Sequence, residues 1–333
     1  MSKYIMGVDG GGTKSHLAIF NEDGKCVCFK SRGPLNHEMM EGSYEELEKV
    51  LPEFLLGSLE EAGISPADLA HSVLGLAGVD TKWQHELISG IIEKAGIKNF
   101  TLCNDAFIGV TAGCPNGAGI CAINGTGFCI AALDHSGNIF QLGGMGVLTD
   151  DCGGSTWYSE QVLGTVYNAL FRFGKQTLIT DLMFAKLGIT DKKDYTETLA
   201  TKLYTEVDFS ELNRLVFEAA AKKDEVAMDI LKRSAENYAG GIAYLARNMD
   251  FPTNKALQIA FAGSIFTKEK VQILPKMVRE RVYDLLGRRN PAGKYRLEFN
   301  TLDTPPVAGA VLWAAHRASF TIDMRRIKKE LPK

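Results

Sequence analysis

A strand, a glycine-rich turn and a second strand occupy the first twenty residues of the chain. Tyr4–Val8 is an apolar, β-favouring run that ends on the carboxylate Asp9, and a second apolar run follows at His16–Phe20. Between them stands Gly-Gly-Gly-Thr-Lys, residues 10–14. Two such runs joined by a short glycine-rich segment predict a β-hairpin. Glycines at its tip let the backbone approach a ligand and present several N–H groups, which suits a phosphate.

The same hairpin has other interpretations. A tight turn without any ligand fits the three glycines about as well. A Walker loop does not fit, because the G-x-x-x-x-G-K-[ST] spacing is missing and no helix follows, and a dinucleotide fingerprint fails for the same reason. Asp9 adds the kind of carboxylate that a hydrated magnesium ion prefers.

Size and composition narrow the class of protein. The 333 residues are enough for two domains with a sizeable core. A net charge of −3 gives no reason to expect nucleic acid or an anionic membrane as a partner. The first residues lack the apolar stretch of a signal peptide, and no apolar run approaches the ~20 residues that span a bilayer.

The cysteines point to a reducing environment. There are seven of them, an odd and scattered set, so a disulfide framework is not expected and a cytoplasmic location is. Cys26 and Cys28 form a lone C-x-C on one predicted strand, and no cysteine has partners at zinc-ligand spacing.

The order of elements predicts a mixed sheet flanked by helices on both sides, built twice. In the first half we expect a three-stranded meander, a helix near 44–62 capped by Ser43, then strand, helix and strand up to Cys103. Near Gly113 a weaker copy begins, with strand, Gly-Thr-Gly turn and strand again. A pattern that occurs twice indicates a duplicated domain and not a solenoid. Residues 156–187 and 196–249 are mainly helical in pattern, and a helix is expected at 306–318.

Asp105 is a carboxylate at the end of the predicted strand 100–103. Ligands of open α/β sheets gather beyond the carboxyl ends of strands, where a carboxylate could take the proton of an attacking hydroxyl. The alternative is that Asn104 and Asp105 cap the following helix. Asp80 is likewise either a residue of a cleft or the cap of the helix after it.

Two further segments suit a nucleotide. Gly125, Thr126 and Gly127 form a second turn between strands, whose amides and hydroxyl could hold phosphates. Gly263 and Ser264 follow the apolar strand 256–262, where the glycine would let backbone lie against a flat ring. Read alone, each segment is also an ordinary turn.

In order, these segments resemble the actin-like ATPase and sugar kinase superfamily, and VDGGGTKS is typical of the branch that contains N-acetylglucosamine kinase and the BadF/BadG/BcrA/BcrD ATPases. The resemblance covers nearly the whole chain. It implies an α/β fold of two ribonuclease-H-like domains with ATP and Mg²⁺ between them. It also implies phosphate-binding residues, an adenosine segment at Gly263 and Ser264, Asp9 as a magnesium ligand through water, and Asp105 in Asn-Asp-Ala as the catalytic base. The implied phosphate-binding residues are Gly10, Gly11, Gly12, Thr13, Lys14, Gly125, Thr126 and Gly127.

The resemblance also marks a sugar site, and here the chain departs from the pattern. The residues implied to contact the sugar are Asn36, Gly78, Asp105, Gly144, Met145 and Asp151. Four positions in the glycine-rich segment and one after Gly-Thr-Gly differ from the family: Met145 for Trp, Asp150 for Gly, Cys152 for Glu, Gly154 for Ser, and Phe128 for a small polar residue. Loss of an aromatic platform and an acidic acceptor predicts a pocket not tuned for N-acetylglucosamine.

We therefore expect an ATP-dependent sugar or amino sugar kinase. The N-terminal domain would comprise 1–112 plus about 306–333, and the C-terminal domain 113–305 with a helical insertion. One alternative is an ATPase that drives a partner enzyme, although Cys121, Cys129 and Cys152 do not reproduce the iron–sulfur segment of such activators. The other is a non-catalytic sugar sensor, although no helix-turn-helix precedes the first strand. A homodimer is left open.

Overall fold

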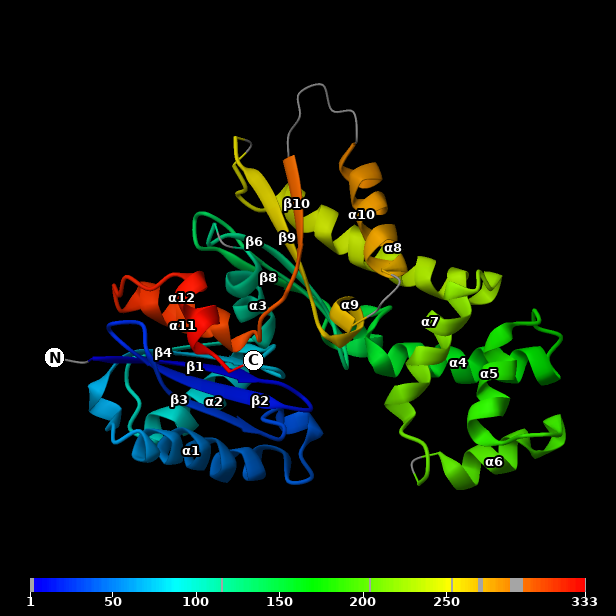
Figure 1. Ribbon diagram of the computed structural model, residues 1–333, viewed down its shortest axis with the longest axis horizontal. Helices are drawn as coiled ribbons and strands as arrows, with labels where there is room; N and C mark the ends of the chain where they lie inside the picture. Colours follow the sequence, from blue (N-terminus) through cyan, green and yellow to red (C-terminus); the bar gives the residue numbers. More distant parts are fainter. Residues whose placement is uncertain are drawn as a thin grey trace.

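Two five-stranded sheets with the same connectivity organise the molecule (Figure 1). The structure is a computed structural model, and it describes residues 3–114, 116–203, 205–252, 254–268, 272–287 and 296–332. The strand orders are β3-β2-β1-β4-β5 and β10-β9-β6-β7-β8. In each sheet an antiparallel meander of three strands is followed by two strands that pair in parallel. The predicted duplication and the mixed α/β fold are confirmed.

The first sheet and its helices form the N-terminal lobe, the lower left part of Figure 1. Its elements are β1 (Tyr4–Gly10), β2 (Ser15–Asn21), β3 (Cys26–Arg32), α1 (Ser43–Glu61), β4 (Leu69–Leu76), α2 (Lys82–Lys94) and β5 (Phe100–Cys103). Helices α1 and α2 cover one face, where leucines and isoleucines such as Leu51, Leu55 and Ile92 are fully buried. That face carries the amphipathic period that the sequence showed.

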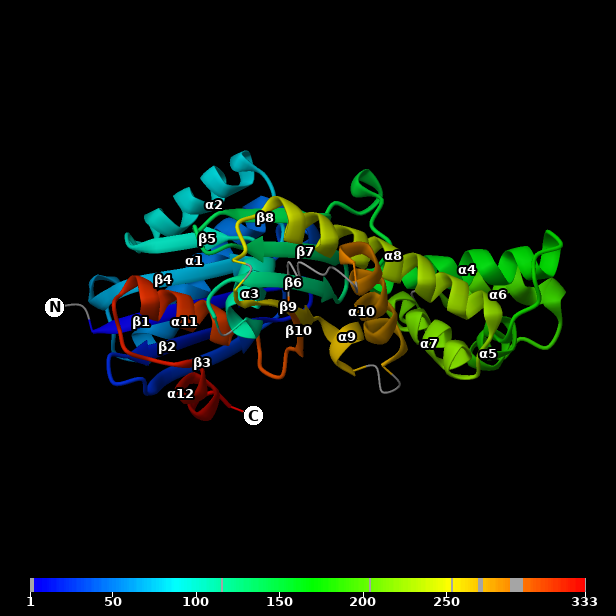
Figure 2. The same ribbon diagram turned by 90° about the horizontal axis from the view of Figure 1, so that it is seen from above.

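The second sheet carries the helical insertion and forms the C-terminal lobe. Its strands and adjoining helices are β6 (Gly119–Asn124), β7 (Phe128–Leu133), β8 (Ile139–Leu142), β9 (Ala256–Ala262), α9 (Ser264–Lys268), α10 (Ile273–Leu286) and β10 (Arg296–Thr301). The insertion consists of α4 (Gly154–Phe171), α5 (Leu178–Leu187), α6 (Tyr195–Lys202), α7 (Asn213–Ala221) and α8 (Glu225–Asn248). It extends away from the N-terminal lobe (Figure 2).

Two helices lie between the sheets. α3 (Asp105–Gly113) packs on β6, β7 and β9, and α11 (Val307–Arg317) packs on α3, β1 and β4. One apolar cluster joins this layer to both sheets, from Ile5 and Val73 on one side to Cys121 and Ala260 on the other. The helix expected at 306–318 thus returns to the first sheet, with its N-terminus one residue later than predicted.

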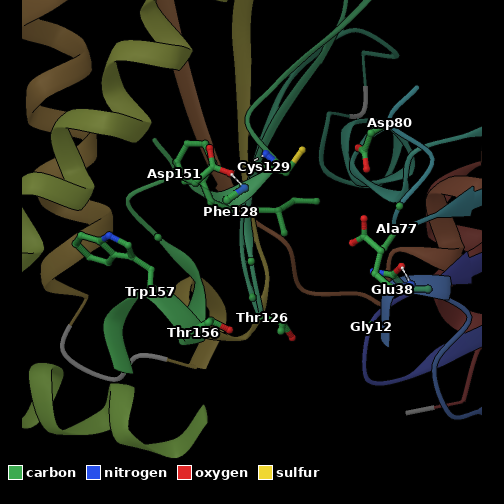
Figure 3. Close-up of a pocket in the computed structure, with 18 of the residues that line it drawn as sticks. Gly12, Glu38, Ala77, Asp80, Thr126, Phe128, Cys129, Asp151, Thr156 and Trp157 are labelled. Atoms are coloured by element: carbon green, nitrogen blue, oxygen red, sulfur yellow. Dashed lines mark hydrogen bonds between the residues drawn. The ribbon is translucent and has the colours of Figure 1, made fainter. Parts of the chain in front are cut away.

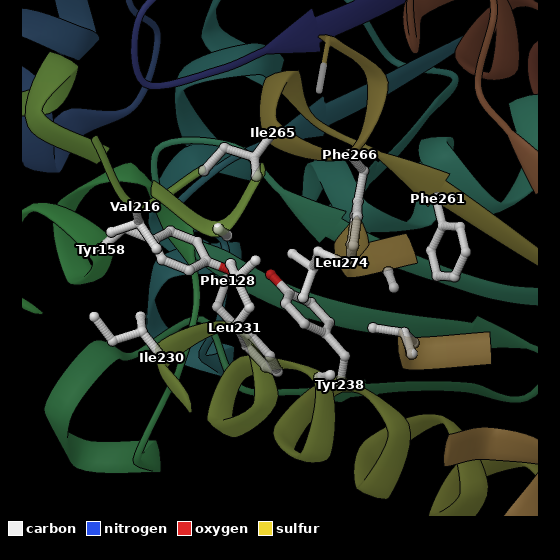
Figure 4. Close-up of a cluster of buried hydrophobic side chains, with 14 of the residues drawn as sticks. Phe128, Tyr158, Val216, Ile230, Leu231, Tyr238, Phe261, Ile265, Phe266 and Leu274 are labelled. Atoms are coloured by element: carbon white, nitrogen blue, oxygen red, sulfur yellow. The ribbon is translucent and has the colours of Figure 1, made fainter. Parts of the chain in front are cut away.

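A second core holds the insertion against the second sheet (Figure 4). Phe128 of β7 stacks near Tyr238 of α8, with ring centroids 4.3 Å apart. The Tyr238 hydroxyl donates to the Ile123 carbonyl at 2.8 Å, and Tyr158 of α4 shares a 2.6 Å hydrogen bond with Ser234. These buried hydroxyls are satisfied, so the aromatic side chains fix α4 and α8 beneath the sheet.

Several local expectations are wrong. Gly42, not Ser43, is the N-cap of α1, because Ser43 is already helical in position, although Glu46 does accept the Gly42 N–H at 3.0 Å. Of the two interpretations left open for Asp80, the helix cap does not hold, because Thr81 caps α2 in a capping box with Gln84.

The long helical stretches are interrupted: 156–187 contains two helices, and 196–249 contains three together with Tyr204, which lies outside the described residues. The C-terminal tail forms α12 (Met324–Glu330), whose Ile327 is buried. No helix in the described part of the chain is both long and apolar enough to cross a membrane.

Candidate active site

A cavity of about 580 Å³ lies between the two lobes. Figure 3 shows Gly12, Asp80 and neighbouring residues on one wall, and Phe128, Asp151 and Trp157 on the other. The N-terminal lobe contributes the β1–β2 turn, the segment after β3, the β4–α2 turn and the start of α3. The C-terminal lobe contributes the β6–β7 turn, the segment after β8 and the first turns of α4. The residues that line the cavity therefore lie where strands or helices begin or end.

The tips of the two predicted phosphate hairpins meet across this cavity. Thr13 Oγ1 of the first and Thr126 Oγ1 of the second are 3.5 Å apart. Four of the eight residues predicted to bind phosphate line the cavity, namely Gly12, Gly125, Thr126 and Gly127. Gly10, Gly11, Thr13 and Lys14 belong to the first hairpin without lining it, and Gly10 is buried as the last residue of β1.

The N-terminus of α4 packs directly on the second turn. The Ser155 N–H donates to the Gly125 carbonyl at 2.8 Å, and the Thr156 N–H donates to the Thr126 carbonyl at 3.4 Å. Gly154 has φ +83°, and a Cβ there would lie 2.5 Å from the Thr126 carbonyl oxygen. Only glycine fits that position, which explains this departure from the family pattern. The positive end of the α4 dipole thereby points at the turn.

Asp105 lines the cavity as the first residue of α3. The cap is Asn104, whose side-chain oxygen accepts the Ala106 N–H at 2.9 Å, so the capping interpretation holds for Asn104 alone. The pKa of Asp105 is raised to about 7. Burial is the largest cause, and the nearby charges of Asp9 and Asp80 add to it. A carboxylate with a pKa near neutrality is suited to accept a proton.

Asp9 and Asp80 complete an acidic group around Asp105. Burial raises the pKa of Asp9, against the opposing effect of His16, whose Nδ1 is 3.8 Å from the Asp9 carboxylate. Burial also raises the pKa of Asp80, although hydrogen bonds from Gln141 and Asn104 act against it. Asp80 lines the cavity and Asp9 lies at the end of β1.

The predicted sugar residues Asn36 and Gly78 lie side by side on the cavity wall. Asn36 is buried and caps a short 3₁₀ turn, accepting the Glu38 N–H at 3.0 Å. Gly78 has φ +82°, and a Cβ there would lie 2.7 Å from the Asn36 side-chain oxygen. Both the turn interpretation and the cavity position therefore apply to Asn36, and its amide nitrogen is left for another acceptor.

Asp151 organises the glycine-rich segment. Its carboxylate accepts N–H groups from Gly144 at 2.9 Å and Gly146 at 2.8 Å, and the Thr149 hydroxyl at 2.9 Å. Burial raises its pKa while these hydrogen bonds lower it. Gly144 and Asp151 both line the cavity. With three of its lone-pair positions used, Asp151 has little capacity left for a sugar hydroxyl in this conformation.

Of the five residues that depart from the family pattern, Phe128, Met145 and Cys152 lie in different surroundings. Phe128 and Cys152 are buried, Phe128 in the core against Tyr238 while still lining the cavity. Met145 is 47% exposed and does not line the cavity. Phe128 thus lies at the cavity wall, whereas Met145 is at the surface outside the cavity.

Gly263 and Ser264, predicted for adenosine, do not line the cavity either. Gly263 packs on the backbone of the second turn, where a Cβ would lie 2.5 Å from the Asn124 carbonyl carbon and oxygen. Ser264 is exposed at the start of α9. The structure thus places the predicted segment beside the second glycine-rich turn.

Sequence reasoning missed two groups of residues. Gln141 of β8 donates to Asp80 across the lobes at 2.5 Å, and nothing in a lone glutamine on an edge strand indicated this. The first turns of α4 extend the cavity with Thr156, Trp157, Glu160 and Gln161. Trp157, with Arg233 5.4 Å from its ring centre, directly follows Gly-Gly-Ser-Thr, and that signal was available.

Known proteins share both sequence and fold with this chain. An N-acetylmuramic acid/N-acetylglucosamine kinase of Clostridium acetobutylicum is 25% identical over 264 residues, which cover 79% of this chain and 85% of that protein. An N-acetyl-D-glucosamine kinase of Dictyostelium discoideum is 24% identical, covering 84% and 92%.

Among solved structures, a ROK family glucokinase of Streptomyces griseus, in complex with glucose and AMPPNP, matches with a TM-score of 0.58 at 18% identity, covering 94% of this chain and 98% of that one. This likeness shows the shared two-lobed fold. The model of the BadF/BadG/BcrA/BcrD ATPase family matches residues 6–314. The chain therefore belongs to the BadF/BadG/BcrA/BcrD ATPase family.

Proposed function

We propose that the protein transfers the γ-phosphoryl group of ATP to a hydroxyl of a sugar or amino sugar. Membership of an ATPase family implies that it uses ATP. The kinases of N-acetylglucosamine among its relatives support a sugar as the acceptor. The function needs a nucleotide site, an acceptor site and a base that share one space.

The observation that carries the proposal is the position of Asp105. Its carboxylate lines the same cavity as the two glycine-rich turns, which approach each other through Thr13 and Thr126. Phosphates held by the turns and a hydroxyl placed beside Asp105 would therefore meet in line. Asn36, Gly78 and Gly144 surround the acceptor side of this cavity.

The residues do the following work. Amides of the turns bind the phosphates, and the dipole of α4, whose first N–H groups donate to the second turn and to Asn124, offsets their charge from behind that turn. Asp105, with a pKa of about 7, accepts the hydroxyl proton as the oxygen attacks the γ-phosphorus, and ADP leaves. Closure of the lobes would exclude water and so limit hydrolysis of ATP.

Among the described residues, no group of three or more histidine, cysteine, aspartate or glutamate side chains is placed to ligate a metal ion directly. Asp9 and Asp80 are near enough to Asp105 for their charges to raise its pKa. We propose that Asp9 holds Mg²⁺ through water. The ion would neutralise charge on the β- and γ-phosphates.

The cysteines disfavour the rival function, an ATPase that activates a partner enzyme. Cys121 and Cys129 lie in the apolar layer between the lobes, where burial raises the pKa of each thiol well above its usual range. Such thiols are poor ligands for an exposed cluster. The free state of all seven cysteines also supports a cytoplasmic location.

The test is ADP release, measured by a coupled assay, across N-acetylated sugars, amino sugars and neutral hexoses. The proposal expects at least one sugar to raise ADP release at least tenfold above the sugar-free rate, with one phosphorylated sugar formed per ADP. ADP release that no sugar stimulates would favour the partner-coupled ATPase. Sugar binding by calorimetry without any turnover would favour the sensor.

A further inference from the structure

A second cavity, of about 450 Å³, lies at the opposite end of the second sheet. It shares no lining residue with the active-site cavity. Strand β6 joins the two: Asn124 precedes the phosphate turn, whereas Ala118, just before β6, lines the second cavity. Six strand residues at ~3.3 Å each separate the cavities by roughly 20 Å. We call this second cavity the rear groove.

Both lobes build the rear groove. Trp313 and Arg317 come from α11, which packs on the first sheet. Leu133, the turn after β7 and Lys255 before β9 come from the C-terminal lobe. The connection from α3 to β6, one of the two crossings between the lobes, lines the groove through Asn116, Gly117 and Ala118. A ligand here would touch this connection between the lobes.

The groove has an excess of uncompensated positive charge. Arg317 and Lys255 are exposed, and the side chain of neither forms an ion pair or hydrogen bond within the ranges that the structure describes. The pKa of His71 is lowered mainly by burial and, to a smaller extent, by the positive charge of Arg317. His135 adds a third basic side chain at the rim.

Asp134 is the acidic residue that lines the groove, and its charge offsets one of the two cations, Arg317 and Lys255, so an excess of positive charge remains. Asp134 is buried and accepts the N–H groups of Ser136, Asn138 and Asp250 at 2.9–3.1 Å. It also accepts the Asn138 side-chain amide at 3.0 Å. Burial raises its pKa, but these hydrogen bonds outweigh burial and lower it. Asp250 accepts the Ser136 hydroxyl at 2.7 Å. Both carboxylates are thus engaged in holding the β7–β8 turn.

Trp313 gives the groove an apolar wall. Its side chain is partly exposed and packs on the apolar layer between the sheets. An indole face beside unpaired cations suits a ligand with a flat, weakly polar ring and a strongly anionic group. A sugar phosphate has both, since the C–H face of its ring packs on aromatics and its phosphate pairs with Arg and Lys.

We propose that the rear groove is an effector site for a sugar phosphate, bound by Arg317 and Lys255 through the phosphate and by Trp313 through the ring. The claim that the natural ligand is the product of this enzyme rests on the proposed function. The claim that the groove binds a sugar phosphate does not. A phosphate that bridges Arg317 and Lys255 would tie the two lobes together beside the α3–β6 connection. The proposal takes closure of the active-site cavity to move these two side chains apart, so that the bound anion opposes closure and inhibits the enzyme.

The experiment compares the wild type with Arg317→Ala/Lys255→Ala and with the charge-matched control Arg325→Ala/Lys329→Ala on exposed positions of α12. Calorimetry measures binding of glucosamine 6-phosphate and, separately, of inorganic phosphate, both without ATP. Kinetics then measure inhibition by the same two probes against the sugar that the enzyme prefers.

The expected result is binding of the sugar phosphate that weakens about tenfold or more in the groove variant and not in the control. Inhibition should raise the sugar KM about fivefold or more in the wild type, persist when ATP is saturating, and disappear in the groove variant, whose uninhibited kcat stays unchanged. Trp313→Phe should weaken the sugar phosphate but not inorganic phosphate.

Three results would overturn the proposal. The first is no binding of glucosamine 6-phosphate at 10 mM, a concentration about two orders of magnitude above the range expected for such a site. The second is equal binding by the wild type and the groove variant, and the third is equal affinity for glucosamine 6-phosphate and inorganic phosphate. Equal binding by both proteins would place the ligand in the active-site cavity. Because binding is measured without turnover, a failed kinase assay leaves this test intact.

Discussion

Gln141 of the C-terminal lobe donates a 2.5 Å hydrogen bond to Asp80 of the N-terminal lobe. Asn104, the residue before Asp105, donates to the same Asp80 oxygen at 3.0 Å. One carboxylate therefore connects the edge strand β8, the β4–α2 turn and the start of α3. This connection fixes the position of Asp105 relative to the glycine-rich segment that follows β8.

Gln141→Ala removes the link between the lobes. A hydrogen bond to a charged group contributes about 1.5–3 kcal/mol, so we expect kcat/KM for the sugar to fall about tenfold or more. Steady-state kinetics measure this. Gln176→Ala is the matched control, because its amide donates to the Ala169 carbonyl within the helical insertion, away from the cavity. Equal effects of the two substitutions would show that the link does not matter.

Asp105→Asn tests the base. The amide keeps the size of the side chain and removes its basicity, so sugar phosphorylation should fall by ~10²-fold or more while ATP binding is kept. Asp229→Asn, an exposed carboxylate on α8, serves as the control. A variant that turns over at near wild-type rate would rule out Asp105 as the base.

The same substitution should change how stability depends on pH. The pKa of Asp105 is about 7 when folded and near 3.8 when unfolded, so between these values only the folded state holds the proton. Stability from this group is complete below about pH 3.8 and is lost as pH rises through 7. We expect Asp105→Asn to melt higher than the wild type at pH 8, and the difference to shrink by pH 5 in a calorimetric series. A constant difference would argue against the raised pKa.

Asp80→Asn should shift the pH profile of kcat/KM. The wild type should lose activity below about pH 7 as Asp105 becomes protonated. Because the charge of Asp80 raises the pKa of Asp105, its removal should move this acidic limb to lower pH, and the amide oxygen still accepts from Gln141. An acidic limb at the same pH in both proteins would contradict the coupling.

Met145→Trp tests the altered sugar site. Met145 is exposed beside the glycine-rich segment, whereas Phe128 and Cys152 are buried. The wild type should use N-acetylglucosamine less well than another sugar of the panel. An indole platform contributes about 0.5–1.5 kcal/mol, so the substitution should raise kcat/KM for N-acetylglucosamine about two- to tenfold. If the wild type already prefers N-acetylglucosamine, the interpretation of these departures is wrong.

The sequence by itself determined the duplicated α/β fold and the two glycine-rich turns. Glycine patterns and strand periodicity are local, and they predicted the hairpins around Gly12 and Thr126. The position of Asp105 after a strand also predicted a place at the edge of a sheet, because parallel strands end together.

Tertiary structure alone decided which residues meet between the lobes. The contact of Gln141 with Asp80, 61 residues away, depends on how the two sheets pack on α3 and α11, and no local pattern encodes that packing. The pKa of Asp105 likewise follows from burial and from Asp9 of β1 and Asp80 of the β4–α2 turn. Short-range preferences thus specify the elements, whereas the chemistry of the cleft arises from long-range packing and electrostatics.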